Sequence, residues 1–382
     1  MKSITRRQFL KGVVGGACVF TLSRIPLDPI WDDGQGQDAF AGVPELSRVE
    51  ARYYQRLSNQ EVECQLCPRR CRVGDLERGF CGVRENREGT YHTLVHSRPA
   101  ALNIDPIEKK PFFHFLPSTL AFSLATAGCN IHCKFCQNWD ISQVRPEQVQ
   151  NSYLPPEAIV SEARQAGCTS IAYTYSEPVI FYEYMIDIAR LARRKGLKSV
   201  VVTNAFINPE PLTELCGQVD AVKVDLKAFT EKYYQEVCKG ELKPVLESLK
   251  ILKKQGIWYE IVYLTVPTLN DQEGAIRKMC HWIKNELSPH VPVHFTRFHP
   301  MYLLKNLPPT PVKSLERARQ IALDAGLSFV YIGNVPGHEG ENTYCPRCRK
   351  TLIRRVGYSI RENHLQKGAC RYCGEKIPGV WG

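Results

Sequence analysis

The stretch FSLATAGCNIHCKFC, residues 122–136, places three cysteines in one short loop directly after an apolar run. The apolar run is short and is followed by Gly128, which is typical of a buried strand and the turn that ends it. The thiols of Cys129, Cys133 and Cys136 therefore leave the end of one strand together. Such a group of soft ligands indicates a metal site more strongly than it indicates disulfides.

Downstream of this loop, short apolar runs alternate with amphipathic helical stretches. Strands are expected at residues 122–127, 170–175, 199–203, 221–225, 259–265, 293–298 and 329–333. Helices are expected at residues 156–165, 180–195, 209–217, 231–255, 273–287 and 312–325. Repeated βα units predict an α/β fold with a parallel sheet, and their number suits a full or partial (βα) TIM barrel over residues 121–336. In such barrels the functional groups gather at the carboxyl ends of the strands.

The bulk composition describes a globular chain that is rich in cysteine. The 382 residues are 43% apolar, which is enough to bury a full-sized core. The net charge of +11 is spread along the chain among 39 acidic residues, which disfavours a nucleic-acid partner. Eleven of the sixteen cysteines fall into three tight groups. The other five are expected to be ordinary core residues: Cys18, Cys168, Cys216, Cys238 and Cys280.

Three thiolates in one loop favour an iron–sulfur cluster, because thiolates hold such clusters in proteins. A [4Fe-4S] cubane has four irons, so three cysteines leave one iron open. S-adenosylmethionine (SAM) offers an amino nitrogen and a carboxylate oxygen to that iron, and an electron from the reduced cluster could cleave its adjacent carbon–sulfur bond. Phe135 would shield the cluster and the adenine pocket from water. Zinc with His132 as the fourth ligand is the alternative.

The Cys-x3-Cys-x2-Cys spacing, with an aromatic residue before the last cysteine, resembles the radical SAM superfamily. The resemblance implies that SAM also contacts residues at the next three strand ends. These residues are Ser176 and Glu177, then Thr203 and Asn204, then Asp225 and Lys227. Glu177 matches the carboxylate of a Gly-Gly-Glu-Pro motif that binds the SAM amino group, but Tyr175 and Ser176 replace its two glycines. For Thr203 and Asn204, turn chemistry at a strand end is the alternative.

Two further candidates lie at the end of the sixth expected strand, in the segment RFHP at residues 297–300. Arg297 could hold a carboxylate, because a guanidinium pairs well with one. His299 could relay a proton, because imidazole titrates near neutrality. For both, an ordinary surface or core side chain is the alternative.

A second cysteine group lies in the N-terminal segment, residues 43–120, which also has a short strand expected at 90–97. The group comprises Cys64, Cys67, Cys71 and Cys81. Four thiolates make a closed, fully ligated site for zinc or for an auxiliary [4Fe-4S] cluster, and spacing does not separate these two. A pair of disulfides is the alternative.

The third group forms two Cys-x2-Cys pairs with 21 residues between them: Cys345, Cys348, Cys370 and Cys373. This pattern predicts a zinc-ribbon-like tail over residues 337–382. Nearby basic residues could contact nucleic acid: Arg347, Arg349, Lys350, Arg354 and Arg355. We favour a metal-stapled cap that packs on the barrel, because no aromatic–basic stripe accompanies these charges.

The first 41 residues resemble a twin-arginine signal peptide. The pair Arg6-Arg7 precedes an apolar run at 12–22, and a cleavage-like Ala-Phe-Ala triplet follows at 39–41. The apolar run is shorter than the roughly 20 residues of a permanent transmembrane helix, so none is expected. The leader indicates periplasmic export, whereas SAM and low-potential electrons are cytoplasmic supplies, so both locations stay open. An amphipathic leader with an accidental arginine pair is the alternative.

Several stretches are similar to the radical SAM component of the AmmeMemoRadiSam system, a neighbour of the pyruvate formate-lyase activating enzymes. They are CPRRC (67–71), DPIEKKP (105–111), CQNWDIS (136–142), YIGNVPGHE (331–339) and IPGVWG (377–382). The resemblance implies an oxidoreductase that cleaves SAM to methionine and a 5'-deoxyadenosyl radical, which abstracts hydrogen from a protein or small-molecule substrate. It also implies a flavodoxin or ferredoxin as electron donor, and Memo-like and AMMECR-like partners.

Two other functions are considered beside this one. The first is a glycyl-radical-enzyme activating enzyme, which shares the same chemistry. The second, from another class, is an iron–sulfur electron-transfer protein. An electron carrier would normally fill the fourth iron site with a cysteine, and no cysteine close to Cys129, Cys133 and Cys136 in the sequence is expected to do so.

Overall fold

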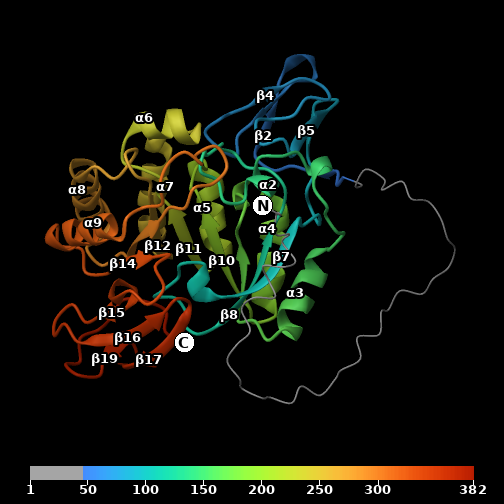
Figure 1. The fold of residues 1–382 in the computed structure, drawn as a ribbon. Helices are drawn as coiled ribbons and strands as arrows, with labels where there is room; N and C mark the ends of the chain where they lie inside the picture. Colours follow the sequence, from blue (N-terminus) through green and yellow to red (C-terminus); the bar gives the residue numbers. More distant parts are fainter. Residues whose placement is uncertain (1–45) are drawn as a thin grey trace, which may run out of the picture. The chain divides into compact units, whose positions relative to one another are not determined.

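The computed structural model describes residues 46–382. Its centre is an open eight-stranded sheet in the order β14-β13-β12-β11-β10-β9-β8-β7 (Figure 1). The strands are β7 (Ala101–Pro106), β8 (Leu120–Ala125), β9 (Ser170–Tyr173), β10 (Lys198–Thr203), β11 (Ala221–Asp225), β12 (Trp258–Thr265), β13 (Val293–Arg297) and β14 (Val330–Gly333). Strands β8 to β14 run parallel, which confirms the α/β fold with a parallel sheet.

The sheet begins earlier in the chain than predicted. Strand β7 pairs antiparallel with β8, from Ala101 opposite Ala125 to Pro106 opposite Leu120. It lies in the segment that was expected to be separate from the barrel. Asn103 and Asp105 interrupt its apolar residues Leu102 and Ile104, so the strand carries no continuous apolar run that would have marked it as part of the core.

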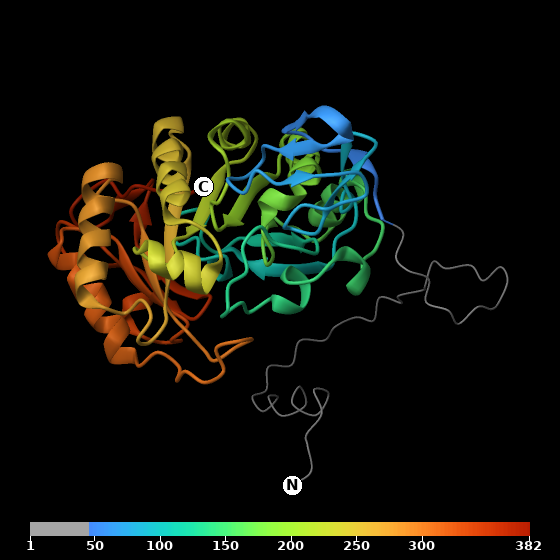
Figure 2. The same cartoon turned by 90° about the horizontal axis from the view of Figure 1, so that it is seen from above.

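Helices connect consecutive strands of the sheet, as expected for βα units. They are α3 (Pro156–Gln165), α4 (Tyr182–Arg194), α5 (Pro209–Gln218), α7 (Leu242–Gln255), α8 (Glu273–Trp282) and α9 (Val312–Asp324). Figure 2 shows α8 and α9 side by side at the β13–β14 end of the sheet, where they pack on each other. No helix among residues 46–382 has the length and apolar character needed to cross a membrane.

The single helix expected at residues 231–255 is divided. It forms α6 (Glu231–Tyr233), a π-helical turn (Tyr234–Cys238) and α7. Lys239 adopts a left-handed conformation with φ 56°, which ends the turn. A Cβ on Gly240 would lie 2.9 Å from Ile131 Cγ2, so this break packs closely against the loop at 129–136. The helix expected at 273–287 likewise ends as a π-helical turn (Ile283–Leu287).

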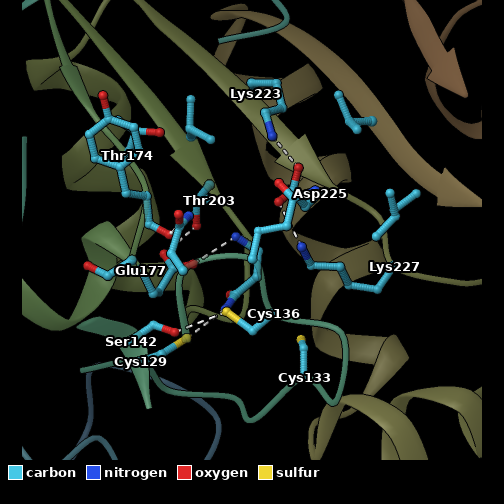
Figure 3. A pocket seen from close by; sticks show the side chains of 18 of the residues that line it. Cys129, Cys133, Cys136, Ser142, Thr174, Glu177, Thr203, Lys223, Asp225 and Lys227 are labelled. Carbon is cyan, nitrogen blue, oxygen red and sulfur yellow. Dashed lines mark hydrogen bonds and ion pairs between the residues drawn. The ribbon is translucent and has the colours of Figure 1, made fainter. Parts of the chain in front are cut away.

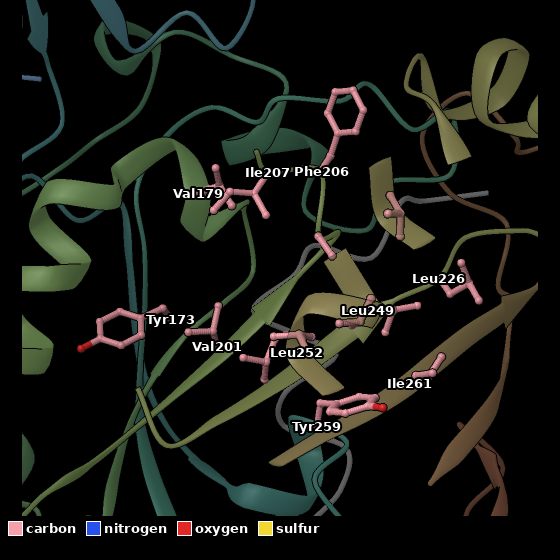
Figure 4. Packing of buried hydrophobic residues seen from close by; sticks show 14 of the residues in the cluster. Tyr173, Val179, Val201, Phe206, Ile207, Leu226, Leu249, Leu252, Tyr259 and Ile261 are labelled. Atoms are coloured by element: carbon pink, nitrogen blue, oxygen red, sulfur yellow. The ribbon is translucent and has the colours of Figure 1, made fainter. Parts of the chain in front are cut away.

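The main core lies between the sheet and its helices. Figure 4 shows Val201 of β10 and Ile261 of β12 packed in the same cluster as Leu249 and Leu252 of α7. All four side chains are almost completely buried. The helical residues recur on one face of α7, which is the pattern that buries an amphipathic helix against a sheet.

Two small three-stranded sheets form the N-terminal segment. One contains β2 (Tyr54–Arg56), β3 (Val62–Cys64) and β4 (Arg72–Val73), and the other contains β1 (Val49–Glu50), β6 (Thr90–Thr93) and β5 (Arg84–Arg87). Arg84 of β5 donates to both carboxylate oxygens of Glu183 in α4 at 2.7 Å. Both side chains are buried, so this ion pair fixes the segment to the barrel.

The C-terminal segment forms another small sheet against the barrel. It contains β15 (Thr343–Tyr344), β16 (Thr351–Val356) and β17 (Ser359–Asn363), followed by β18 (Leu365–Gln366) and β19 (Ala369–Cys370). Arg355 is 2% exposed and donates to the Phe113 carbonyl at 2.9 Å. The amide of Val380 donates to the His114 carbonyl at 2.7 Å. These contacts hold the segment as a cap on the barrel and remove Arg355 from any nucleic-acid surface.

Candidate active site

The loop at 129–136 begins at a tight backbone contact. Gly128 has a φ of 93°, and a Cβ there would lie 2.7 Å from the Cys81 carbonyl oxygen. The loop is held from its other side by the π-helical turn, because His132 N donates to Cys238 O at 2.8 Å and Lys134 N donates to Val237 O at 2.9 Å. The short helix α2 (Trp139–Ser142) follows it. The loop is thus a fixed platform for its cysteines.

A cavity of about 440 Å³ opens above this loop. Figure 3 shows Cys129, Cys133 and Cys136 on one side of it, and polar side chains of strand ends on the other. Of the residues predicted to bind a cofactor, six line the cavity: Ser176, Glu177, Thr203, Asn204, Asp225 and Lys227. They come from the carboxyl ends of β9, β10 and β11, where parallel strands place their functional groups.

Glu177 is the most enclosed carboxylate of the cavity. Its Oε1 accepts from Thr203 Oγ1 at 2.5 Å and from Val179 N at 3.1 Å, and its Oε2 accepts from Asn204 N at 2.8 Å. Burial raises its pKa to about 7 although these hydrogen bonds lower it. The hydrogen bonds therefore fix the orientation of the carboxylate but do not neutralise its negative charge. A cationic partner would suit this site.

Two polar side chains contact the cysteine sulfurs. Asn204 Nδ2 donates to Asn130 Oδ1 at 2.9 Å and lies 3.9 Å from Cys129 Sγ. Ser142 Oγ lies 3.0 Å from Cys136 Sγ. Hydrogen bonds to sulfur tune the potential of a thiolate-bound cluster. The sequence did not single out Ser142, because only folding of α2 brings it back to the loop.

A charged triad occupies the end of β11. Asp225 forms ion pairs with Lys223 and with Lys227, the latter at 2.7 Å (Figure 3). Burial alone would raise the pKa of Asp225, but the two ammonium groups lower it to about 2. The carboxylate is thus anionic at neutral pH. Lys223 was missed in the sequence, although residues two apart share one face of a strand.

Tyr175 takes the place of a glycine in the backbone. Its φ of 63° is left-handed, a conformation that glycine favours. Its hydroxyl donates to Asp105, its ring faces the Lys110 Nζ at 4.3 Å, and its carbonyl accepts from Asn138 Nδ2 at 2.9 Å. The segment therefore keeps the turn of the glycine motif, and side-chain contacts hold it there.

A model of the radical SAM superfamily matches residues 123–280. An uncharacterized protein of Methanocaldococcus jannaschii is 46% identical over 330 residues, which covers 86% of this chain and 98% of that protein. The chain belongs to the radical SAM superfamily. A pyruvate formate-lyase-activating enzyme of Clostridium pasteurianum is 24% identical over 164 residues, covering 41% of this chain and 67% of that enzyme. A radical SAM methyltransferase structure from Sphaerobacter thermophilus aligns with a TM-score of 0.46 at 17% identity, covering 59% of this chain and 71% of that one.

Membership of the radical SAM superfamily implies a [4Fe-4S] cluster and SAM, and the cavity fits both. Three thiols from one loop face the same space. The buried Ser176 Oγ lines it without a hydrogen-bond partner among the described residues. A ligand with a polar group would satisfy that hydroxyl, and an ammonium group would compensate Glu177.

Two of the predicted site residues lie outside the cavity. Arg297 and His299 are not among the residues that line the cavity. Arg297 Nε instead donates to the Thr310 carbonyl at 2.9 Å, and His299 is exposed to solvent. Arg297 is the last residue of β13, and its neighbour Thr296 lines the cavity, so the alternation of side chains along the strand places Arg297 on the other face. His299 lies beyond the end of the strand.

One cysteine lies closer to the cluster loop than the sequence indicated. Cys238 is completely buried and its thiol is hydrogen-bonded to that of Cys133. Cys238 is a core residue, as expected, and the left-handed Lys239 turns the chain back so that this residue also reaches the loop. Cys238 does not line the cavity, whereas Cys133 does. His132, the alternative zinc ligand, is exposed and its ring lies 4.3 Å from that of Phe80.

Proposed function

We propose that this protein is a radical SAM enzyme that cleaves SAM reductively and uses the resulting radical on a substrate held in the same cavity. Bound there, the cluster and SAM supply methionine and a 5'-deoxyadenosyl radical, which abstracts a hydrogen atom. The observation that carries the proposal is the lining of the cavity: three loop cysteines face the space, and no fourth cysteine of residues 46–382 lines it.

The chain's own residues bind and orient SAM in this proposal. Glu177 and Ser176 take the amino group, because one is a buried carboxylate and the other a hydroxyl without a partner. Thr203 and Asn204 hold Glu177 in place. Asp225 and Lys227 bind the ribose hydroxyls and the carboxylate of SAM, because they offer an acceptor and a cation at the next strand end.

The partners are proposed from sequence similarity alone. The stretches at 67–71, 105–111, 136–142, 331–339 and 377–382 are similar to the radical SAM component of the AmmeMemoRadiSam system. This similarity suggests Memo-like and AMMECR-like partners and a flavodoxin or ferredoxin as the electron donor. Activation of a glycyl-radical protein is the second candidate, favoured by a relative of Methanocaldococcus jannaschii named a putative glycyl-radical enzyme activating enzyme, 28% identical over 155 residues. Co-purification of a Memo-like protein or a glycyl-radical protein distinguishes the two.

We propose zinc for the C-terminal cysteine set. Cys345 Sγ lies 3.6 Å from Cys373 Sγ, and Cys348 Sγ lies 3.7 Å from Cys370 Sγ. Tetrahedral zinc with bonds of about 2.3 Å places its sulfur ligands about 3.8 Å apart. A Cys345→Ser variant is expected to lose one zinc ion per chain, and unchanged zinc content contradicts the assignment.

The twin-arginine leader lies outside the described residues, and periplasmic export stays a proposal. A reporter fused to residues 1–45 is expected to reach the periplasm only when Arg6 and Arg7 are intact. Retention of the intact fusion in the cytoplasm contradicts export and leaves the cytoplasm as the location.

The test of SAM cleavage uses a matched pair of cysteine variants. The protein is reconstituted anaerobically with iron and sulfide, then given SAM and dithionite, and methionine and 5'-deoxyadenosine are measured. Cys133→Ala is expected to abolish both products, whereas Cys238→Ala is expected to retain them, because only Cys133 faces the cavity. An electron-transfer protein would give no product in any variant. Products that survive Cys133→Ala also reject the proposal.

A further inference from the structure

The four cysteines of the N-terminal segment surround one enclosed space. Cys64 ends β3, Cys67 and Cys71 lie in the turn before β4, and Cys81 lies in the turn before β5. The turn is closed by a hydrogen bond from Cys64 N to Cys71 O at 2.9 Å. All four line a cavity of about 20 Å³.

The spacing of the four sulfurs distinguishes between the two metals that the sequence allows. A zinc ion draws its sulfur ligands to about 2.3 Å from the metal, so that they lie about 3.8 Å from one another. In the described part of the chain, the C-terminal set is the one group of three or more His, Cys, Asp or Glu residues whose ligand atoms all lie within 4.8 Å of one another. The N-terminal set is more widely spread, as are Cys129, Cys133 and Cys136. A cubane requires this wider spread, because each thiolate binds a different iron.

The N-terminal site also touches the loop of the first cluster. The Cys81 carbonyl lies against Gly128, the residue before Cys129, so closely that a Cβ would clash at 2.7 Å. Arg69 lies between the two sites: its Nε donates to Asn130 O at 2.5 Å, and its guanidinium lies 3.4 Å from the centre of the Phe80 ring. The backbone amide of Phe80 lies 3.4 Å from Cys71 Sγ, which is the kind of donor that thiolate-bound clusters accept.

We propose that Cys64, Cys67, Cys71 and Cys81 hold a second, fully ligated [4Fe-4S] cluster that passes electrons to the SAM-binding cluster across the Cys81–Gly128 contact. A donor protein of the flavodoxin or ferredoxin class loses one electron, and the SAM-binding cluster gains it. No bond is formed or broken and no proton moves in this step. The relay rests on the proposed function, whereas the presence of the second cluster does not.

Metal counting on the full chain tests the second cluster. The variant Cys129→Ala/Cys133→Ala/Cys136→Ala cannot hold the SAM-binding cluster, so its result is independent of SAM cleavage. After anaerobic reconstitution with iron, sulfide and zinc, we expect about four iron atoms, four sulfides and one zinc ion per chain. About two zinc ions with no iron would overturn the proposal.

A second measurement remains decisive if the triple variant does not fold. The unmodified chain is expected to hold about eight iron atoms and one zinc ion. The variant Cys64→Ser/Cys67→Ser/Cys71→Ser/Cys81→Ser is expected to keep about four irons, the same zinc content, and an electron paramagnetic resonance signal that shifts when SAM is added. About four irons and two zinc ions in the unmodified chain would reject a second cluster.

The relay has its own spectroscopic test. When dithionite reduces both clusters, two paramagnets on touching loops are expected to broaden or split each other's resonance at low temperature. The matched control is the sum of the spectra from the two variant proteins, each of which holds a single cluster. A spectrum of the unmodified chain that equals this sum would overturn the relay, even where the iron count supports the second cluster.

Discussion

At the scale of single residues, Tyr175 shows how side-chain contacts replace a glycine. Its left-handed backbone costs a non-glycine residue about 1 kcal/mol or more. The hydrogen bond to Asp105 and the contact with Lys110 offset that cost. Replacing Tyr175 removes these contacts in every case, but only a glycine also removes the Cβ and with it the backbone strain.

We expect Tyr175→Ala to be less stable than Tyr175→Gly by about 1 kcal/mol, because both lose the side-chain contacts but only alanine keeps the backbone strain. Urea unfolding of the two variants beside the unmodified protein measures this difference. Equal stabilities would show that the left-handed conformation is not retained in solution.

Glu177 predicts how SAM binding depends on pH. Burial raises the pKa of this carboxyl to about 7, so it takes up a proton as the pH falls below 7 and can no longer pair with an ammonium group. The Kd for SAM is expected to rise up to about tenfold per pH unit below 7, measured by calorimetry on the reconstituted protein. The Glu177→Gln variant is expected to bind more weakly and without this slope. A flat profile in the unmodified protein contradicts the assignment.

The same shift affects stability with the opposite sign. Because the pKa of Glu177 in the folded protein lies above the ordinary glutamate value of 4.5, the stability of the ligand-free protein falls as pH rises between 4.5 and about 7.

At the scale of elements, the sequence predicted the strands of the sheet better than their connections. Buried parallel strands are continuous apolar runs, so β8 to β14 lie within a few residues of their expected positions. The break at Lys239 was missed because a left-handed lysine carries no sequence signal. The contact of the core residue Cys238 with the cluster loop was missed for the same reason. Motif residues such as Glu177 were found, whereas Ser142 and Tyr175 depend on contacts between distant segments.

The cluster loop itself depends on Gly128. The variant Gly128→Ala is expected to lose about 2–4 kcal/mol of stability, because the new Cβ meets the Cys81 carbonyl at 2.7 Å and the backbone is left-handed. The matched control is Gly167→Ala, which is also left-handed, with φ 68°, but has open space around its Cβ. It is expected to lose only about 1 kcal/mol. Denaturant unfolding of both variants measures the two losses of stability. Equal losses would mean that the loop at 129–136 does not contact the turn that carries Cys81.

At the scale of the whole molecule, buried ion pairs and hydrogen bonds fix two small segments to the radical SAM barrel. Arg84 and Glu183 join the N-terminal sheets to α4, and Arg355 joins the C-terminal sheet to the loop that carries Phe113. Composition and spacing do not reveal such pairs, because the partners are far apart in the sequence. The C-terminal cap was nevertheless anticipated from its lack of an aromatic–basic stripe.

Removing one partner of the N-terminal pair is expected to be costly. Glu183→Gln leaves the Arg84 guanidinium buried without a counter-charge, so a loss of about 3–5 kcal/mol is expected in denaturant unfolding. The control is Glu273→Gln, whose partner Arg317 is exposed, and it is expected to cost less than about 1 kcal/mol. Similar losses in the two variants would contradict a structural role for the buried pair.

Tyr358, in the turn between β16 and β17, lines the cavity together with residues of the barrel. The tail that Arg355 anchors therefore furnishes part of the wall around the reacting molecules. A chain shortened before residue 337 would keep its loop cysteines yet present a differently shaped entrance. The tail is thus expected to help determine substrate selectivity. Grafting the tail of a relative onto this barrel would change which molecules enter the cavity.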